Sequence, residues 1–202
     1  EAFVFGEPAD RKQSSVRIRQ RVGFVSEWKD LYPFMTVAGI IRFTKAFYPK
    51  WDDALERKYV REFDLRPDQK VSALSKGTRT KLILLLAICR GAELLILDEP
   101  TDGLDPAMIE DVLQVLVSFN ASAGVTIFFS SHQLTEVEQI ADRICIIDNG
   151  RAVIEGALDD IKANYRRVHA TFDREAPELE AVAVAADRVD RNGRTLSILT
   201  HH

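Results

Sequence analysis

Two mainly apolar runs stand out in the middle of the chain, each followed by polar residues. Residues 94–97 lead into Asp98 and Glu99, and residues 125–129 lead into a Ser-Ser-His tripeptide that ends at His132. Such runs are typical of parallel strands covered on both faces, where apolar and polar residues do not alternate. Ligands of open α/β sheets gather at the carboxyl ends of these strands. We therefore expect the polar residues to meet at one sheet edge.

Helical patterns alternate with these strands. A long apolar cluster at 82–89 follows Ser75, a residue type that favours the position just before a helix. Further helices are predicted after Pro106 and Leu134, and two more in a small helical subdomain within about residues 36–91. The alternation of strands and helices predicts an α/β fold around a parallel sheet.

The pattern changes after the first 160 residues. Residues 167–172 alternate like a strand, and the stretches 183–190 and 195–199 flank an Asn-Gly dipeptide, a strong signal for a β-hairpin. We expect residues 1–160 to form the α/β core and residues 161–202 a small α+β appendage. The appendage has no cluster of catalytic residue types, and we assign it no chemistry.

Composition limits the classes of protein that the chain can represent. It has 202 residues, 46% of them hydrophobic, and a formal net charge of −4. Its basic residues are scattered, which argues against a nucleic acid as a partner. The strongest apolar run, 82–89, is too short to cross a bilayer. Cys89 and Cys145 lie in apolar segments, so we expect two buried free thiols in a reducing compartment.

The polar residues after the two strands suit metal-dependent chemistry on a phosphate. Asp98 is placed to hold Mg²⁺ and Glu99 to orient a water molecule. His132 ends the next strand, where contact with a γ-phosphate fits the geometry. Two simpler interpretations stay open: a core strand followed by a polar turn, and an exposed or structural histidine.

A second candidate site lies at the start of the helix that follows Ser75. Exposed N–H groups and the helix dipole favour an anion there, Gly77 permits close backbone approach, and the Ser75 hydroxyl adds a donor. This end of the helix suits a phosphate group. A plain N-cap turn would have much the same sequence.

The order of these motifs resembles the nucleotide-binding domain of ATP-binding cassette (ABC) transporters over about residues 1–160. Asp98 and Glu99 match the Walker B aspartate and the catalytic glutamate, Asp105 the D-loop aspartate and His132 the switch histidine. By this resemblance the fold is a P-loop NTPase-like core with a helical subdomain, truncated at its N-terminus, plus the α+β appendage.

Several positions depart from the family's pattern. Residues 74–78 stand where the family has Leu-Ser-Gly-Gly-Gln, with Lys76 in place of the first glycine. Glu27 occupies the position of the Q-loop glutamine; a carboxylate there can touch Mg²⁺ or water but cannot donate a hydrogen bond when ionised. Asp102 stands where many relatives carry Ser, which we take as tolerated variation.

The phosphate-binding loop of the family is absent from the sequence. No Gly-x-x-x-x-Gly-Lys-Ser/Thr occurs, and none of the ten glycines is followed by lysine. The family places this loop before the position of Glu27. Because the first residue is Glu1 rather than Met, and His201 and His202 resemble the remnant of a purification tag, we expect a fragment that is inactive alone.

The resemblance implies a subunit that binds and hydrolyses ATP with Mg²⁺ and powers a separate membrane permease from the cytoplasmic face. It implies a homo- or heterodimer with a second nucleotide-binding domain, in which Ser75 and Gly77 reach the partner's ATP. Asp105 and Glu27 are further nucleotide-binding residues by the same resemblance. Residues 131–138 are most similar to exporter-like members.

Alternatives to parts of this interpretation remain. The aromatic-rich segment 28–34 matches the region that receives the permease's coupling helix, but its rings could instead pack beneath the helical subdomain. In place of an ATPase, the chain could be a non-hydrolytic ABC-like module for interaction or dimerisation, which the missing phosphate loop supports. A chromosome-maintenance ATPase would need long coiled coils, and no heptad run lies between Glu27 and Leu74.

Overall fold

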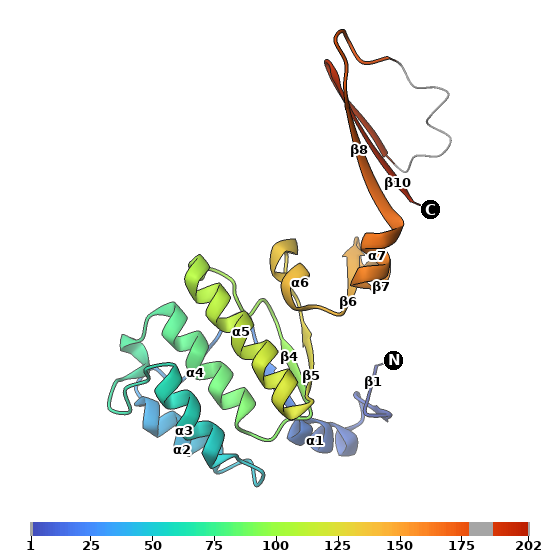
Figure 1. Ribbon diagram of the computed structural model, residues 1–202. Helices are drawn as coiled ribbons and strands as arrows, with labels where there is room; N and C mark the ends of the chain where they lie inside the picture. The colour runs from blue at the N-terminus through green and yellow to red at the C-terminus, as the bar shows by residue number, and fades with distance from the viewer. Residues whose placement is uncertain (1, 178–187, 202) are drawn as a thin grey trace. The chain divides into compact units, whose positions relative to one another are not determined.

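The computed structural model describes residues 2–177 and 188–201, which belong to two compact units (Figure 1). The first unit is Glu1–Glu136 and the second is Val137–His202. The division falls inside helix α6 (Leu134–Ile140). The domain boundary expected near residue 160 stays a prediction.

A three-stranded parallel sheet lies at the centre of the first unit. Strands β3 (Val22–Val25), β4 (Leu94–Leu97) and β5 (Thr126–Phe129) lie in the order β3-β4-β5, with Leu95 opposite Gly23. Parallel strands need long crossover connections, and helices supply them here. The predicted α/β architecture is confirmed.

Two long helices pack on the side of the sheet that carries Leu95, which is fully buried. They are α4 (Lys76–Ile88) and α5 (Pro106–Ala123), which lie next to each other (Figure 1). Helix α4 approaches β3 so closely that a Cβ atom on Gly23 would lie 2.9 Å from the Ala87 carbonyl oxygen. Glycine at this position therefore permits the close packing of helix on strand.

The other side of the sheet is more open. Phe24 of β3 and Phe128 of β5 are 56% and 66% exposed. The expectation of a strand covered on both faces is wrong for β5, because both long helices pack on the face that carries Leu95.

Three helices occupy the region predicted as a helical subdomain: α2 (Val37–Lys45), α3 (Asp53–Glu62) and α4. Side-chain caps fix where the first two begin. The Thr36 hydroxyl accepts a hydrogen bond from the Gly39 N–H at 3.1 Å, and the Asp52 carboxylate accepts from two N–H groups in the first turn of α3.

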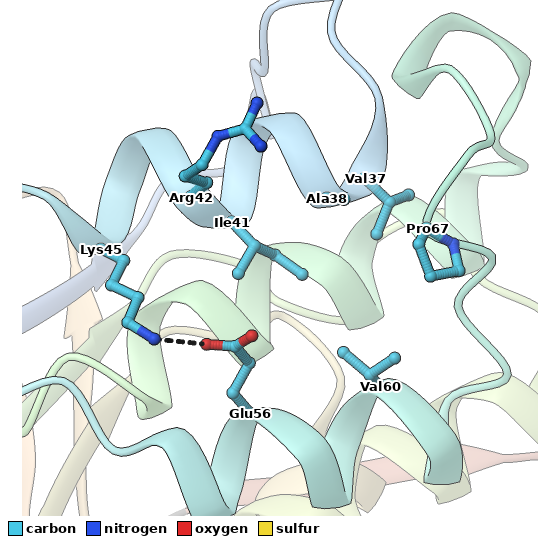
Figure 2. A pocket seen from close by; sticks show the side chains of 8 residues that line it. All are labelled: Val37, Ala38, Ile41, Arg42, Lys45, Glu56, Val60 and Pro67. Atoms are coloured by element: carbon cyan, nitrogen blue, oxygen red, sulfur yellow. Dashed lines mark ion pairs between the residues drawn. The ribbon is translucent and has the colours of Figure 1, made fainter.

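A pocket of about 420 Å³ opens between α2 and α3 (Figure 2). Its wall is mainly apolar, and an ion pair between Lys45 and Glu56 (3.5 Å) lies at one end. The residues that line it are Val37, Ala38, Ile41, Arg42, Lys45, Glu56, Val60 and Pro67. None of them is a predicted site residue, so the pocket belongs to the packing of the helices rather than to the candidate chemistry.

The polar N-terminal stretch contains a helix that the sequence pattern did not predict, α1 (Lys12–Arg21). Its buried residues are Ser14 and Ile18, so it lacks the broad apolar face by which helices are recognised. Before it, β1 (Phe3–Val4) and β2 (Glu7–Pro8) form a short antiparallel pair.

The second unit begins with an antiparallel pair of strands, β6 (Arg143–Asp148) and β7 (Arg151–Ala157), followed by helix α7 (Leu158–Asn164). Cys145 of β6 is exposed, which corrects the expectation of two buried thiols. Successive side chains of a strand point to opposite faces, and Cys145 falls on the same face as the exposed Ile147.

An antiparallel sheet completes the second unit, with β8 (Tyr165–Thr171), β9 (Arg188–Asn192) and β10 (Thr195–His201) in the order β8-β10-β9. The predicted Asn-Gly hairpin is confirmed, because Gly193 joins β9 to β10 with a φ of +55°, a region that favours glycine. Residues 183–187 of the expected preceding strand lie outside the described residues.

Candidate functional site

The loops after β4 and β5 meet at the carboxyl edge of the parallel sheet. The Asp98 N–H donates to the Val25 carbonyl (2.8 Å), and the Ser130 N–H donates to the Leu97 carbonyl (2.9 Å). These bonds extend the hydrogen-bond ladder of the sheet into both loops. They bring together four residues that we call the acid edge: Asp98, Glu99, Ser130 and His132.

The Ser130 hydroxyl joins the two loops of the acid edge. It donates to Asp98 Oδ1 (2.8 Å) and accepts from the Glu99 N–H (2.9 Å). Glu99 has a φ of +44°, a left-handed conformation that costs about 1–3 kcal/mol in a residue with a Cβ atom. The bond to its N–H therefore helps to hold a strained turn.

Glu99 and His132 are hydrogen-bonded to each other. Glu99 Oε2 lies 2.9 Å from His132 Nδ1, and because an ionised carboxylate can only accept, the proton is on Nδ1. The imidazole is 65% exposed. The structure thus brings together the predicted catalytic pair and the predicted metal ligand Asp98, whose chemical roles stay predictions.

Sequence reasoning missed a buried carboxylate next to these residues. Glu136 of α6 is 3% exposed, and its Oε2 accepts from the hydroxyls of Thr101 (2.6 Å) and Ser131 (3.0 Å). Its Oε1 has no hydrogen-bond partner among the described residues. The sequence carries no clear signal for this burial, since the exposed Glu138 lies in the same polar stretch.

The predicted anion site lies at the start of α4, and we call residues 75–78 the signature end. The Ser75 side chain caps the helix by accepting from the Thr78 N–H at 3.1 Å. Gly77 is buried against α5, where a Cβ atom would collide with Met108 Cε. The N-cap interpretation of Ser75 is therefore confirmed, while binding of a phosphate by Ser75 and Gly77 stays a prediction.

The two substituted positions noted in the sequence pair with each other. Lys76 Nζ lies 3.1 Å from Asp102 Oδ2. The hydrogen bond from Lys76 holds the pKa of the Asp102 carboxyl below its ordinary value. The lysine side chain runs over Gly103, where a Cβ atom would collide with Nζ. Asp102 thus supplies a partner for Lys76; that its presence is tolerated variation stays a prediction.

A second lysine, Lys29, reaches the same turn. It is 5% exposed, and its Nζ donates a long hydrogen bond of 3.4 Å to the Asp102 carbonyl oxygen. Burial, and after it repulsion from Lys76, lowers the pKa of Lys29. Among the described residues Lys29 has no ion pair within 4 Å, and attraction from the Asp102, Glu27 and Glu99 carboxylates offsets the burial of its charge only in part.

The two other predicted nucleotide-binding residues, Asp105 and Glu27, lie in loops outside the acid edge. Asp105 caps α5, its Oδ1 accepting from the Met108 N–H at 3.1 Å. Glu27 is exposed in the loop after β3. Within the part of the chain that the structure describes, neither carboxylate is hydrogen-bonded to the acid edge.

Asp98 suits Mg²⁺ as a single protein ligand. Its side chain is exposed and is oriented by the Ser130 hydroxyl at one oxygen. The described residues contain no group of three or more His, Cys, Asp or Glu side chains arranged to hold a metal ion. Mg²⁺ often takes one or two protein carboxylates and completes its shell with water and phosphate oxygens. Asp98 fits that pattern beside a bound phosphate chain.

A row of exposed aromatic rings, which we call the aromatic cluster, joins the loop after β3 to α2. The Tyr32 ring centroid lies 5.8 Å from that of Phe34 and 5.7 Å from that of Phe43, and Phe43 lies 5.2 Å from Phe47. Tyr32 and Phe34 are 50% and 71% exposed, and the nearby Trp28 is 80% exposed. The interpretation in which these three rings are core is therefore wrong.

The parallel α/β sheet matches the P-loop NTPase-like fold of solved ABC ATPases, and its strand ends present an Asp-Glu pair beside a histidine. The family model described as "AAA domain, putative AbiEii toxin, Type IV TA system" matches residues 9–138. The chain is 32% identical over 163 residues to YhaQ of Bacillus subtilis (strain 168), an uncharacterized ABC transporter ATP-binding protein, covering 77% of this chain and 53% of that protein.

Two further likenesses agree. The chain is 31% identical over 202 residues to Nod factor export ATP-binding protein I of Cupriavidus metallidurans, covering 96% of this chain and 66% of that protein. A solved ATP-binding subunit of an ABC transporter matches with a TM-score of 0.67 at 28% identity, over 79% of this chain and 68% of that chain. The chain belongs to the family of ABC transporter ATP-binding proteins. It spans about half to two thirds of the length of these curated relatives.

Proposed function

We propose that this chain is the ATP-hydrolysing part of a subunit that powers a separate membrane permease. The observation that carries the proposal is the hydrogen bond between Glu99 and His132 beside Asp98. Phosphoryl transfer depends on positioning a nucleophile and stabilising charge. Glu99 polarises the attacking water, His132 contacts the γ-phosphate and Asp98 holds Mg²⁺. When bound, that ion neutralises charge on the phosphate oxygens.

The proposed active form is a dimer in which ATP lies between two nucleotide-binding domains, identical or related. Ser75 is the N-cap of a 13-residue helix and Gly77 lies in its first turn, where the helix dipole favours a phosphate. They are not hydrogen-bonded to the acid edge of their own chain within the described residues. This supports a role in contacting the ATP of a second domain, with Asp105 and Glu27 contributing from neighbouring loops.

The sequence contains no phosphate-binding loop motif, and this bears on the activity of the chain by itself. A micromolar ATP site requires about 8 kcal/mol of binding free energy, and the amides and lysine of a phosphate loop supply much of it. We expect residues 1–202 alone to bind ATP weakly and to hydrolyse it near the background rate. The same observation favours the second candidate function, a non-hydrolytic dimerisation module.

The aromatic cluster is the proposed docking surface for the permease. Its rings are exposed, and apolar patches of this kind mark contacts between proteins. Its first rings come shortly after Glu27, a proposed nucleotide-binding residue. A movement of Glu27 on ATP binding or hydrolysis could therefore be passed to the docking surface through the adjoining loop. No helix in the described ranges is long and apolar enough to cross a membrane. The proposed location is the cytoplasmic face of the membrane.

The proposed hydrolysis is tested by Glu99→Gln in a protein that carries a phosphate loop ahead of this chain. Glutamine keeps the shape of the side chain but cannot take a proton from water, so turnover should fall by about 10²–10³-fold. ATP binding should persist, and ATP-bound dimers should accumulate in size-exclusion chromatography.

The matched control is Glu138→Gln, which alters an exposed carboxylate of α6 and should leave turnover unchanged. Normal turnover by the Glu99→Gln protein would contradict the proposal. A complete lack of turnover by the unmutated protein with its phosphate loop would favour the non-hydrolytic module.

A further inference from the structure

One carboxylate oxygen bonds to both loops of the acid edge. Thr101 lies two residues after Glu99, and Ser131 lies directly before His132. The hydroxyls of Thr101 and Ser131 both donate to Oε2 of Glu136, at 2.6 and 3.0 Å. Glu136 therefore sets the spacing between the loop that carries the proposed water-polarising residue and the loop that carries its histidine partner.

The surroundings of this carboxylate make the link strong. Glu136 and Thr101 are 3% and 1% exposed. A buried hydroxyl donor that loses its acceptor is costly, so the two bonds to Glu136 resist being broken. The Ser131 hydroxyl also accepts from the Gln133 N–H at 3.0 Å, which leaves its own proton to point at Glu136.

We propose that Glu136 is a positioning residue, which keeps Glu99 Oε2 against His132 Nδ1 by holding Thr101 and Ser131 together. Its meaning for catalysis rests on the proposed function, whereas the positioning itself rests on the geometry. Glu136 acts through the two hydroxyls and has no direct contact with the reacting groups in this assignment.

The proton position on His132 gives a direct test with the 202-residue chain. The bond to Glu99 requires the proton on Nδ1, while an imidazole that has lost this acceptor holds its proton on either nitrogen. We would measure the imidazole ¹⁵N NMR signals of the neutral ring, assigned with His132→Gln. The unmutated chain should show mainly the Nδ1–H form. Glu136→Ala should lower the ratio of Nδ1–H to Nε2–H forms by about threefold to tenfold.

Two variants separate positioning from a general loss of structure. Glu136→Gln keeps an oxygen that can accept from both hydroxyls and should restore most of the ratio. Glu138→Ala removes an exposed carboxylate from the same helix and should leave the ratio unchanged.

If circular dichroism shows that Glu136→Ala does not fold, Thr101→Val and Ser131→Ala each remove one of the two donors and should each lower the ratio in part. The proposal would be overturned if folded Glu136→Ala, or both hydroxyl variants, had the same ratio of Nδ1–H to Nε2–H forms as the unmutated chain. The measurement uses no nucleotide, so a failure of ATP hydrolysis would count against the proposed function and leave this result in place.

Discussion

The acid edge and the signature end are both candidate parts of a nucleotide site, yet their side chains are held in opposite ways. At the acid edge, side chains from two loops bond to one another, as Ser130 does to Asp98 and His132 does to Glu99. At the signature end, the Ser75 hydroxyl bonds within the first turn of its own helix. The acid edge is thus held by bonds between two loops, whereas Ser75 is held within one helix; Lys76 of the signature end also reaches Asp102, but that pair is exposed.

The two regions also differ in how exposed their bonded side chains are. Glu99 is 22% exposed and its partner His132 is 65% exposed, and the buried Glu136 supports both of their loops from below the surface. The Lys76–Asp102 pair has side chains that are 52% and 44% exposed, and exposed pairs of this kind contribute little. A phosphate that reached the signature end would therefore displace weak contacts.

The largest effect is expected from breaking the acid edge at Asp98. In a protein with a phosphate loop ahead of this chain, Asp98→Ala should weaken Mg²⁺-dependent ATP binding by about tenfold or more, because the proposed metal ligand is gone. Titration calorimetry with and without Mg²⁺ measures this, and Asp111→Ala, at an exposed residue paired with Lys81, is the control. Equal Mg²⁺ dependence in both variants would remove Asp98 from the site.

How much of the two regions could be predicted from the sequence depends on how far apart in the sequence the contacting residues lie. The acids and His132 were predictable, since the apolar runs of β4 and β5 end beside them and parallel strands share one carboxyl edge. The cap at Ser75 was predictable because it lies within one helical turn. Glu136 was not, because its bond to Thr101 joins residues 35 apart in the sequence.

The same reasoning applies to the fold. Strands and capped helices with strong patterns were predicted, whereas α1 has no broad apolar face and was missed. Phe24 and Cys145 are exposed because no neighbouring element in the described part of the chain covers their face of the strand. The residue type alone does not predict which face of a strand is covered. Burial of Lys29 and its approach to Asp102 are likewise properties of the assembled loops.

A matched pair of substitutions tests the difference between the two regions. Ser130→Ala removes two hydrogen bonds at the acid edge, and Ser75→Ala removes a helix cap; each should lower the free energy of unfolding by about 1 kcal/mol in urea titrations. The Ser130→Ala chain alone should also change the ¹⁵N signals of His132. If Ser75→Ala disturbed His132 as much, the two regions would be coupled and the comparison would fail.

A smaller effect of opposite sign is expected at Lys29. Lys29→Met should raise the free energy of unfolding by about 1 kcal/mol near neutral pH, because it removes a buried charge without an ion-pair partner among the described residues. Since the pKa of Lys29 is lowered from 10.5, the unfolded state binds more protons between the lowered value and 10.5. The unmutated chain therefore gains stability as pH rises through that window, and the advantage of Lys29→Met should shrink.

Urea titrations at several pH values measure this advantage. Lys81→Met replaces a lysine that is paired with Asp111 at 2.7 Å and should give no gain, which makes it the matched control. A loss of stability in Lys29→Met at neutral pH would show that its long bond to the Asp102 carbonyl matters more than the cost of burying its charge.

The smallest effect is expected at the pair of Lys76 and Asp102, which a cycle of Lys76→Gly, Asp102→Ser and the double variant isolates. The thermal midpoints of the four proteins should show a coupling of no more than about 2 °C at about pH 7, because both side chains are exposed. The pKa of Asp102 is lowered in the folded state, so the contribution is present above the ordinary aspartate pKa and is lost as pH falls through the lowered value. The coupling should therefore be lost in acid, and it should weaken in about 1 M salt. A coupling that survived acid, or that exceeded the effect of Ser130→Ala, would mean that the signature end is held as firmly as the acid edge, and a ligand would then have no weak contacts to replace.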